Sequence, residues 1–193
     1  MTRRPIHILA HLRRFARARR GATAIEFSII ALPFCALMFG AIELGLVFMA
    51  STTLEFATDA AARKVRTGQF QTSGATTKGN FKSAVCNNMS WLSGPCASKL
   101  TVDVQTFANF TGAAGNNPAN PTLFNPAATC FTTGQPGDIV LVRTYYEWDL
   151  YTPLLNVGLQ NMGAASNKRL ISSATSFRNE PYSTQSPVGA KCN

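Results

Sequence analysis

The hydrophobic positions of this 193-residue chain begin with one long apolar run from Phe27 to Ala50, in which Glu43 is the only charged residue. About 24 residues of helix are about 36 Å long, enough to cross a bilayer core of about 30 Å. The run is longer than the apolar core of a cleavable secretory signal. It therefore predicts a membrane-spanning helix, with Glu43 near its outer end reaching toward the interface.

The helical pattern continues beyond the apolar run. Leu54, Ala57, Ala61 and Val65 recur at three- to four-residue spacing, which is typical of a helix with one buried face. Gly68 is the expected stop. We therefore expect one helix over 22–67, with its first half in lipid and its second half packed on a domain.

The remaining residues, 68–193, are expected to form an extracytoplasmic domain in which helices precede and follow strands. The patterns predict a helix at 77–92 ended by Gly94-Pro95, strands at 100–107, 138–150 and 168–178, a loop at 108–137 and a helical turn at 153–162. The predicted class is α+β, with a small antiparallel sheet of at least three strands against the long helix.

The strand at 138–150 is rich in aromatic residues. Alternation places Tyr146 and Trp148 on one face, with Arg143 and Glu147 on the other, which we expect to be solvated. Buried aromatic residues of a core are the favoured interpretation. The alternative is a carbohydrate- or surface-binding site that also uses Tyr145 and Tyr151.

The net charge of +9 belongs mainly to residues 1–21, because seven arginines and no acidic residue precede Gly21. Residues beyond Gly21 carry only +2, so a basic stripe for nucleic acid is not expected. Positive residues beside an apolar run keep that end in the cytoplasm. Residues 1–21 are therefore interpreted as a basic cytoplasmic leader.

Five cysteines are present, and Cys35 in the apolar run is interpreted as a small hydrophobic residue. Cys86, Cys96, Cys130 and Cys192 follow the run, and four cysteines outside the cytoplasm indicate two disulfides. Three pairings are possible. We favour Cys86–Cys96, a local loop, and Cys130–Cys192, which fixes the C-terminal tail.

Glu26 lies at the start of the apolar run, where a carboxylate inside lipid costs about 2.5–3.5 kcal/mol. One interpretation is that Glu26 lies in the cytoplasmic headgroup region and so avoids that cost. The favoured interpretation is a positive partner: cleavage after Gly21 would create an α-amino group on Ala22, which can pair with Glu26 of the next subunit.

The segment GATAIEF, in which Gly21 is followed after four residues by Glu26 and then Phe27, resembles the processing site of type IV pilin-like proteins. The longer stretch RRGATAIEFSIIALPFCALMFGAIELGLVF is similar to the N-terminus of the TadE-like family of minor pilins and pseudopilins. The late strand DIVLVRTYYEWDLYTPLL and the ending with Arg178, Glu180, Pro181 and Tyr182 also resemble that family.

This resemblance implies a minor pilin of a Tad-type (type IVc) pilus, acting in pilus assembly, adhesion and surface attachment. Gly21 would be the last leader residue for a prepilin peptidase, Ala22 the mature N-terminus, and Glu26 with Phe27 the assembly residues. The implied partners are other Tad pilins, the assembly platform and the bacterial inner membrane, with the C-terminal domain periplasmic. After processing, the protein would reach the pilus or cell surface.

No reaction is indicated by the sequence. The two histidines, His7 and His11, both lie in the leader, and no nucleotide-binding motif is present. We therefore expect no enzyme activity, no cofactor and no metal. The alternative function is an anchored, unprocessed binding or adhesin domain that uses the aromatic strand or the Asn/Pro-rich loop.

Overall fold

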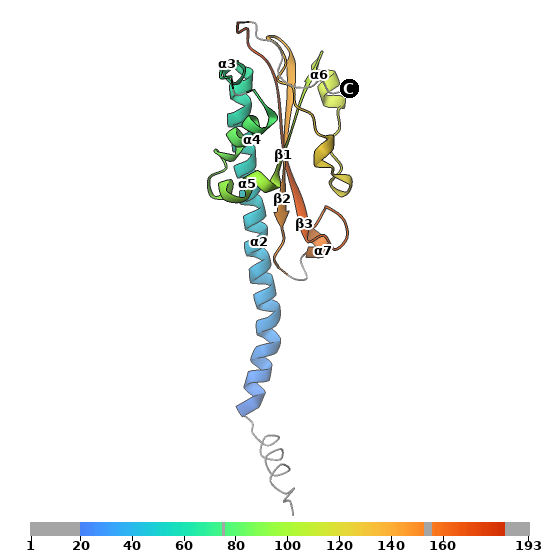
Figure 1. Ribbon diagram of the computed structural model, residues 1–193. Helices are drawn as coiled ribbons and strands as arrows, with labels where there is room; N and C mark the ends of the chain where they lie inside the picture. The colour runs from blue at the N-terminus through green and yellow to red at the C-terminus, as the bar shows by residue number, and fades with distance from the viewer. Residues whose placement is uncertain (1–19, 75, 153–155, 184–193) are drawn as a thin grey trace, which may run out of the picture. The chain divides into compact units, whose positions relative to one another are not determined.

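The computed structural model describes residues 20–74, 76–152 and 156–183 and divides the chain into two units, Met1–Ile42 and Glu43–Asn193. The predicted α+β class is confirmed (Figure 1). The helices and strands are α2 (Arg20–Arg66), α3 (Gln69–Thr72), α4 (Lys78–Cys86), α5 (Ser93–Lys99), β1 (Leu100–Phe107), α6 (Phe110–Gly115), β2 (Ile139–Asp149), α7 (Asn156–Leu159) and β3 (Lys168–Arg178), with 3-10 turns at Ser90–Leu92, Pro121–Leu123 and Pro126–Ala128.

Helix α2 is continuous over Arg20–Arg66 and is long and apolar enough to span a membrane. Three basic residues, Arg63, Lys64 and Arg66, lie in its last turn, where they oppose the negative end of the helix dipole. The helix ends just before Gly68, the predicted stop, because this residue adopts a φ of 76° and its N–H bonds to the Val65 carbonyl at 3.1 Å. A left-handed conformation at this position is most easily adopted by glycine.

The sheet is antiparallel, in the order β1-β2-β3. Strand β2 is central: Val142 pairs with Val104 of β1 and with Thr175 of β3. Branched and aromatic residues fill this strand, which suits a position buried between two neighbours.

The main core lies between this sheet and the domain half of α2. Leu54, Ala57 and Val65 are fully buried, as the helical spacing predicts. Inside this layer, the Thr58 and Thr144 hydroxyl oxygens lie 2.6 Å apart, and Thr58 also donates to the Leu54 carbonyl at 2.7 Å. Thr144 must therefore donate to Thr58, so a polar pair is satisfied inside an apolar layer.

The second face of the sheet is also covered, contrary to the expectation that it is solvated. Arg143 is buried and donates to Asn116 and to the Asn117 carbonyl. Tyr145 is 2% exposed and packs on Phe124, with ring centroids 5.0 Å apart. Residues 108–137 thus form a second layer, with α6 on the side of the sheet opposite to α2 (Figure 1).

The prediction of a helix at 77–92 was wrong for the second half of that range. Helix α4 ends at Cys86, and a new helix, α5, begins at Ser93. Gly94 and Pro95, expected to end a helix, instead lie in the first turn of α5. Proline is tolerated there because first-turn N–H groups have no partner within the helix.

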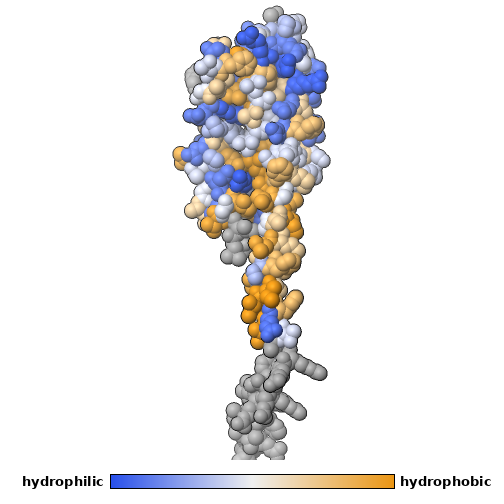
Figure 2. Space-filling view, turned by 180° about the vertical axis from the view of Figure 1, so that it is seen from behind, coloured by the Kyte–Doolittle hydropathy of each residue, from blue (hydrophilic) through white to orange (hydrophobic). Residues whose placement is uncertain are grey.

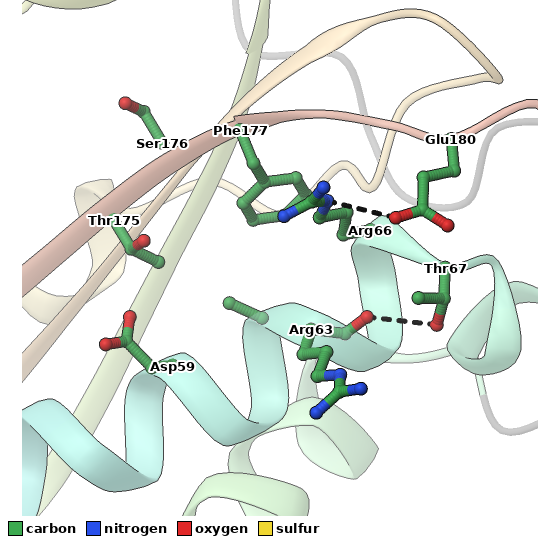
Figure 3. A pocket seen from close by; sticks show the side chains of 9 residues that line it. Asp59, Arg63, Arg66, Thr67, Thr175, Ser176, Phe177 and Glu180 are labelled. Atoms are coloured by element: carbon green, nitrogen blue, oxygen red, sulfur yellow. Dashed lines mark hydrogen bonds and ion pairs between the residues drawn. The ribbon is translucent and has the colours of Figure 1, made fainter.

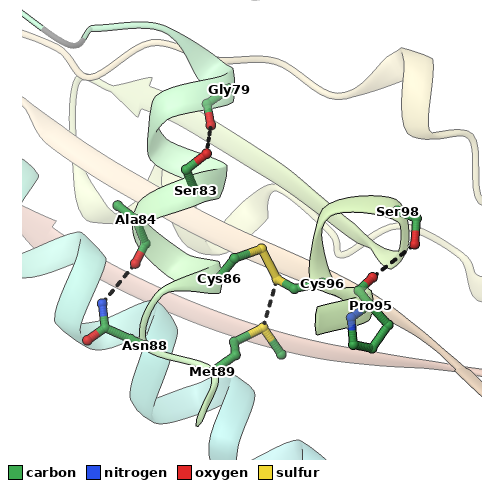
Figure 4. The surroundings of a disulfide bond; sticks show 9 residues. All are labelled: Gly79, Ser83, Ala84, Cys86, Asn88, Met89, Pro95, Cys96 and Ser98. Carbon is green, nitrogen blue, oxygen red and sulfur yellow. Dashed lines mark hydrogen bonds between the residues drawn. A yellow bond between two sulfur atoms is a disulfide. The ribbon is translucent and has the colours of Figure 1, made fainter. Parts of the chain in front are cut away.

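The predicted Cys86–Cys96 disulfide joins α4 to α5 (Figure 4), with a Cα–Cα distance of 5.6 Å. The Met89 sulfur lies 3.3 Å from the Cys96 sulfur, under the chain reversal that the disulfide closes. Cys130 is disulfide-bonded as well. Its predicted partner, Cys192, lies outside the described residues, so the Cys130–Cys192 pairing stays a prediction.

Candidate assembly surface

The residues of the predicted processing motif lie in the first turns of α2. Gly21, Glu26 and Phe27 are exposed, and the Phe27 side chain is 71% exposed. Within the described part of the chain, the Glu26 carboxylate has no ion pair and no hydrogen bond. The Ala22 side chain and leader residues 1–19 lie outside the described residues. The motif is therefore exposed on the helix, and no residue of the described chain covers it.

An apolar surface follows this motif. Its exposed members up to residue 42 are Ile25, Phe27, Ile29, Ile30, Leu32, Phe34, Leu37, Met38, Phe39 and Ile42. They point in all directions around the helix, as a lipid-facing segment does. The space-filling view shows hydrophobic residues along this part of the helix (Figure 2).

Glu43 marks the start of the compact domain. The expectation that it reaches the membrane interface was wrong: Glu43 is 3% exposed, and its two carboxylate oxygens accept the backbone N–H groups of Tyr151 at 2.6 Å and Thr152 at 2.7 Å. These residues follow β2, so the carboxylate ties the helix to the end of the central strand. The apolar segment free to lie in lipid therefore ends at Ile42.

Beyond Glu43, helix α2 is apolar on two sides. One side, with Val47, Ala50, Leu54, Ala57, Ala61 and Val65, is buried in the domain core. The other side keeps Leu44, Phe48, Met49 and Phe56 exposed, and Phe48 and Phe56 are 71% and 69% exposed. Sequence reasoning missed this second stripe because the strong core pattern accounted for the helix by itself.

The aromatic strand does not form an open binding surface. Tyr145, Tyr146 and Trp148 are buried, which confirms the core interpretation. Burial raises the pKa of the Tyr146 phenol, which the nearby Lys99 ammonium partly opposes. Tyr151, by contrast, is exposed.

The terminal signature, which consists of Arg178, Glu180, Pro181 and Tyr182, holds the end of the described chain against the end of α2. Arg66 and Glu180 form an ion pair at 3.2 Å, and the Glu180 N–H donates to the Arg66 carbonyl at 2.9 Å. The Tyr182 hydroxyl accepts from Gln71 at 3.0 Å and from Asn179 at 3.1 Å. Burial raises the pKa of Tyr182. Glu180 and Tyr182, which were expected only from the family resemblance, thus hold the end of the described chain against the domain.

A pocket of about 630 Å³ lies beside this closure, between α2 and β3 (Figure 3). Its lining residues are Asp59, Ala62, Arg63, Arg66, Thr67, Thr175, Ser176, Phe177 and Glu180. The described residues contain no group of three or more His, Cys, Asp or Glu side chains arranged to bind a metal ion.

These features define a protein with one helix able to span a membrane, an acidic residue near its start, and an α+β domain built on its second half. The sequence model of the family described as TadE-like protein matches residues 21–63. The resemblance to the TadE-like family is therefore confirmed over this stretch, which runs from Gly21 to Arg63 and lies within α2. No curated protein and no solved structure gives a significant match to the chain.

Proposed function

We propose that the protein is a membrane-anchored minor pilin or pseudopilin of a Tad-type pilus, and that it joins or primes the filament through helix α2. The observation that carries this proposal is the second apolar side of α2, outside the segment free to lie in lipid. Leu44, Phe48 and Phe56 have no cover within the described chain, although they belong to the folded domain. Such a stripe is typical of an interaction surface.

The energetic argument favours helix packing. Burying one phenylalanine side chain contributes about 1.5–3 kcal/mol. Phe48 and Phe56 lie eight residues apart, which is close to two helical turns, so both face the same neighbour. A neighbouring helix from another pilin buries both at once and thereby stabilises a filament.

The N-terminal motif supports the processing step of the proposal. Cleavage after Gly21 by a prepilin peptidase leaves Ala22 as the N-terminus, with its amino group about one turn from Glu26. That amino group, on one subunit, pairs with the exposed Glu26 carboxylate of the next. Phe27, also exposed, packs beside this contact.

The seven arginines of the leader support an orientation with the N-terminus in the cytoplasm and the domain in the periplasm. The Cys86–Cys96 disulfide agrees with an oxidising compartment. Before assembly the protein resides in the inner membrane, where it meets the peptidase, the other pilins and the assembly platform. After assembly it contributes to adhesion at the cell surface.

Intact-mass measurement of the protein from cells with and without prepilin peptidase tests the processing step. We expect a mass that corresponds to an N-terminus at Ala22 only when the peptidase is present. An N-terminus at Met1 in both strains would instead support an anchored, unprocessed domain.

The variant Glu26→Ala tests the assembly step. We expect loss of surface filaments with unchanged membrane insertion, because the subunit loses its pairing carboxylate. Thr122→Ala, at an exposed residue of the 3-10 turn Pro121–Leu123 and outside helix α2, is the control and should leave filaments intact. Normal filaments in the Glu26 variant would refute the assigned role.

A further inference from the structure

The part of α2 that can face lipid on all sides is shorter than a bilayer core. It begins after Glu26 and ends at Ile42, because Glu43 is buried in the folded domain. About 16 residues of helix are about 24 Å long, whereas the hydrocarbon core is about 30 Å thick. Tilt of this segment only shortens the distance that it covers, so the deficit is at least about 6 Å for any orientation.

The deficit can be met at either end of this segment or by the bilayer. At the inner end, Glu26 would have to enter the core, where a carboxylate is unfavourable. Thinning of the bilayer also costs free energy. At the outer end, by contrast, α2 continues with Leu44 and Phe48, which are 57% and 71% exposed. Transfer of such side chains out of water is favourable, so extension at the outer end is preferred.

One side of α2 provides this extension. Leu44 and Phe48 lie four residues apart and therefore on the same side of the helix, whereas Val47 and Ala50 are buried in the domain core. The apolar run thus faces two environments in its last part, the core on one side and an uncovered surface on the other. From Phe27 to Phe48 the helix has about 22 residues and is about 33 Å long, which matches the thickness of a bilayer core.

Polar residues of α2 limit how far this side can enter lipid. Three hydroxyl-bearing residues, Ser51, Thr52 and Thr53, follow the apolar run. Glu55 is exposed and lies seven residues beyond Phe48, which places it on nearly the same side of the helix. Its carboxylate must stay in water or among the headgroups. Lipid contact on this side therefore ends between Phe48 and Glu55.

The end of β2 lies at the depth of Glu43. The Tyr151 and Thr152 N–H groups donate to the two carboxylate oxygens of Glu43 at 2.6 and 2.7 Å, so these residues share its depth at any tilt. Glu43 is 3% exposed, and its hydrogen bonds make a carboxylate tolerable beside lipid. Tyr151 is 74% exposed, and its apolar ring and polar hydroxyl suit a membrane interface.

An ion pair limits how far this end of the sheet can enter lipid. Asp149 and Lys99 pair at 2.6 Å, and both side chains are partly exposed. Strand β2 runs along the domain half of α2 (Figure 1), and Asp149 precedes Tyr151 by at most about 7 Å of extended chain. Charged groups are excluded from the hydrocarbon core, so the domain can sink by about this distance. The depth that the strand allows agrees with the depth that the helix requires.

We infer that the end of the domain next to the membrane is sunk into the adjoining leaflet, with Leu44 and Phe48 among the acyl chains and Tyr151 among the headgroups. The inference rests on the proposed membrane anchoring and adds a lipid contact of the folded domain itself. Phe56 lies eight residues beyond Phe48, about 12 Å along the helix, and stays outside the lipid. Filament assembly then exchanges the lipid on Phe48 for a neighbouring helix.

Spin labels on the full chain test this depth. The background variant Cys35→Ser removes the exposed free thiol, and Leu37→Cys, Phe48→Cys and Phe56→Cys each place a label at an exposed position. The protein is reconstituted at high dilution into vesicles of phosphatidylcholine and phosphatidylglycerol. Electron paramagnetic resonance then compares collisions with oxygen, which dissolves in lipid, and with a water-soluble nickel chelate. Oxygen should dominate at positions 37 and 48, and nickel at position 56.

The label at Leu37 separates the two ways in which the test can fail. Nickel collisions dominating at position 37 would contradict membrane anchoring itself and the inference with it. Oxygen dominating at position 37 but nickel at position 48 would overturn the inference alone. A label at position 48 shielded from both reagents would also overturn it, because a second copy of the chain would then cover Phe48.

Bilayer thickness provides an independent test of the length argument. In vesicles of shorter acyl chains, with a core about 24 Å thick, the helix up to Ile42 completes the span without the domain. Nickel collisions at Phe48→Cys should therefore rise relative to the thicker bilayer, whereas those at Leu37→Cys should stay low. Unchanged collisions at position 48 would refute the argument from length. Melting temperatures of the labelled proteins show that each remains folded.

Discussion

The Glu43 carboxylate accepts the backbone N–H of Tyr151 at 2.6 Å, across a sequence separation of 108 residues. A buried carboxylate is stable only when its oxygens accept hydrogen bonds, and the Thr152 N–H supplies a second one. One side chain thus fixes the place where helix α2 becomes part of the domain. The apolar run of the sequence extends to Ala50, eight residues beyond Ile42, where the segment free to lie in lipid ends.

Glu43→Ala should destabilise the domain by about 1–3 kcal/mol, because two partly buried backbone N–H groups lose their acceptor. Glu43→Gln should lie between this variant and the parent, since the amide offers one acceptor oxygen instead of two. Thermal unfolding followed by circular dichroism measures both effects. Glu55→Ala is the control, and its unfolding free energy should stay within about 0.5 kcal/mol of the parent.

Phe56→Ser should remove the protein from filaments and leave the domain stable. Phe56 is 69% exposed, so its replacement should change the unfolding free energy by less than about 0.5 kcal/mol. The comparison variant Leu54→Ala, at a fully buried position two residues away, should cost about 2–5 kcal/mol. Immunoblots of sheared filaments and of whole cells measure incorporation. Normal incorporation of Phe56→Ser would contradict the proposed packing surface.

The helix and the three strands could be predicted from sequence because their signals are local. The spacing of Leu54, Ala57, Ala61 and Val65 defines one helix face without knowledge of its partner. The strands at 100–107, 138–150 and 168–178 agree with the structure within a residue at each end. Each is set by alternation and by turn residues, which act over a few positions.

The features that could not be predicted depend on contacts between distant residues. Nothing near Arg143 in the sequence indicates that Asn116 covers it, and nothing near Glu43 indicates Tyr151. The break between α4 and α5 lies between Cys86 and Ser93, and the Cys86–Cys96 disulfide, a contact that no local pattern specifies, joins the two short helices across it. The position of β3 at the edge of the sheet likewise depends on the strand order, which alternation does not specify.

Gly68→Ala should destabilise the domain by more than Gly74→Ala, although both glycines have positive φ, 76° and 70°. At Gly68 a Cβ atom would lie 2.5 Å from Cγ of Tyr182, whereas at Gly74 no atom of the described residues beyond the chain neighbours lies within 4 Å. The control variant, Gly74→Ala, should therefore lose only the unfolding free energy that corresponds to left-handed backbone strain, about 1–2 kcal/mol. The difference in unfolding free energy measures the packing of the terminal signature on α2. Equal losses would show that Tyr182 moves away freely.

Cys86→Ser should lower the stability of the domain by about 2–4 kcal/mol, because the disulfide no longer restricts the unfolded chain. The bond spans 10 residues and is buried against Met89, so the new hydroxyl also enters an apolar site. Cys35→Ser is the matched control, since Cys35 is an exposed free thiol outside the compact domain. Chemical denaturation of both variants under non-reducing conditions gives the comparison. An equal loss of stability in Cys35→Ser and Cys86→Ser would mean that the disulfide makes no specific contribution. A loss confined to Cys86→Ser would show that the disulfide stabilises the chain reversal between α4 and α5.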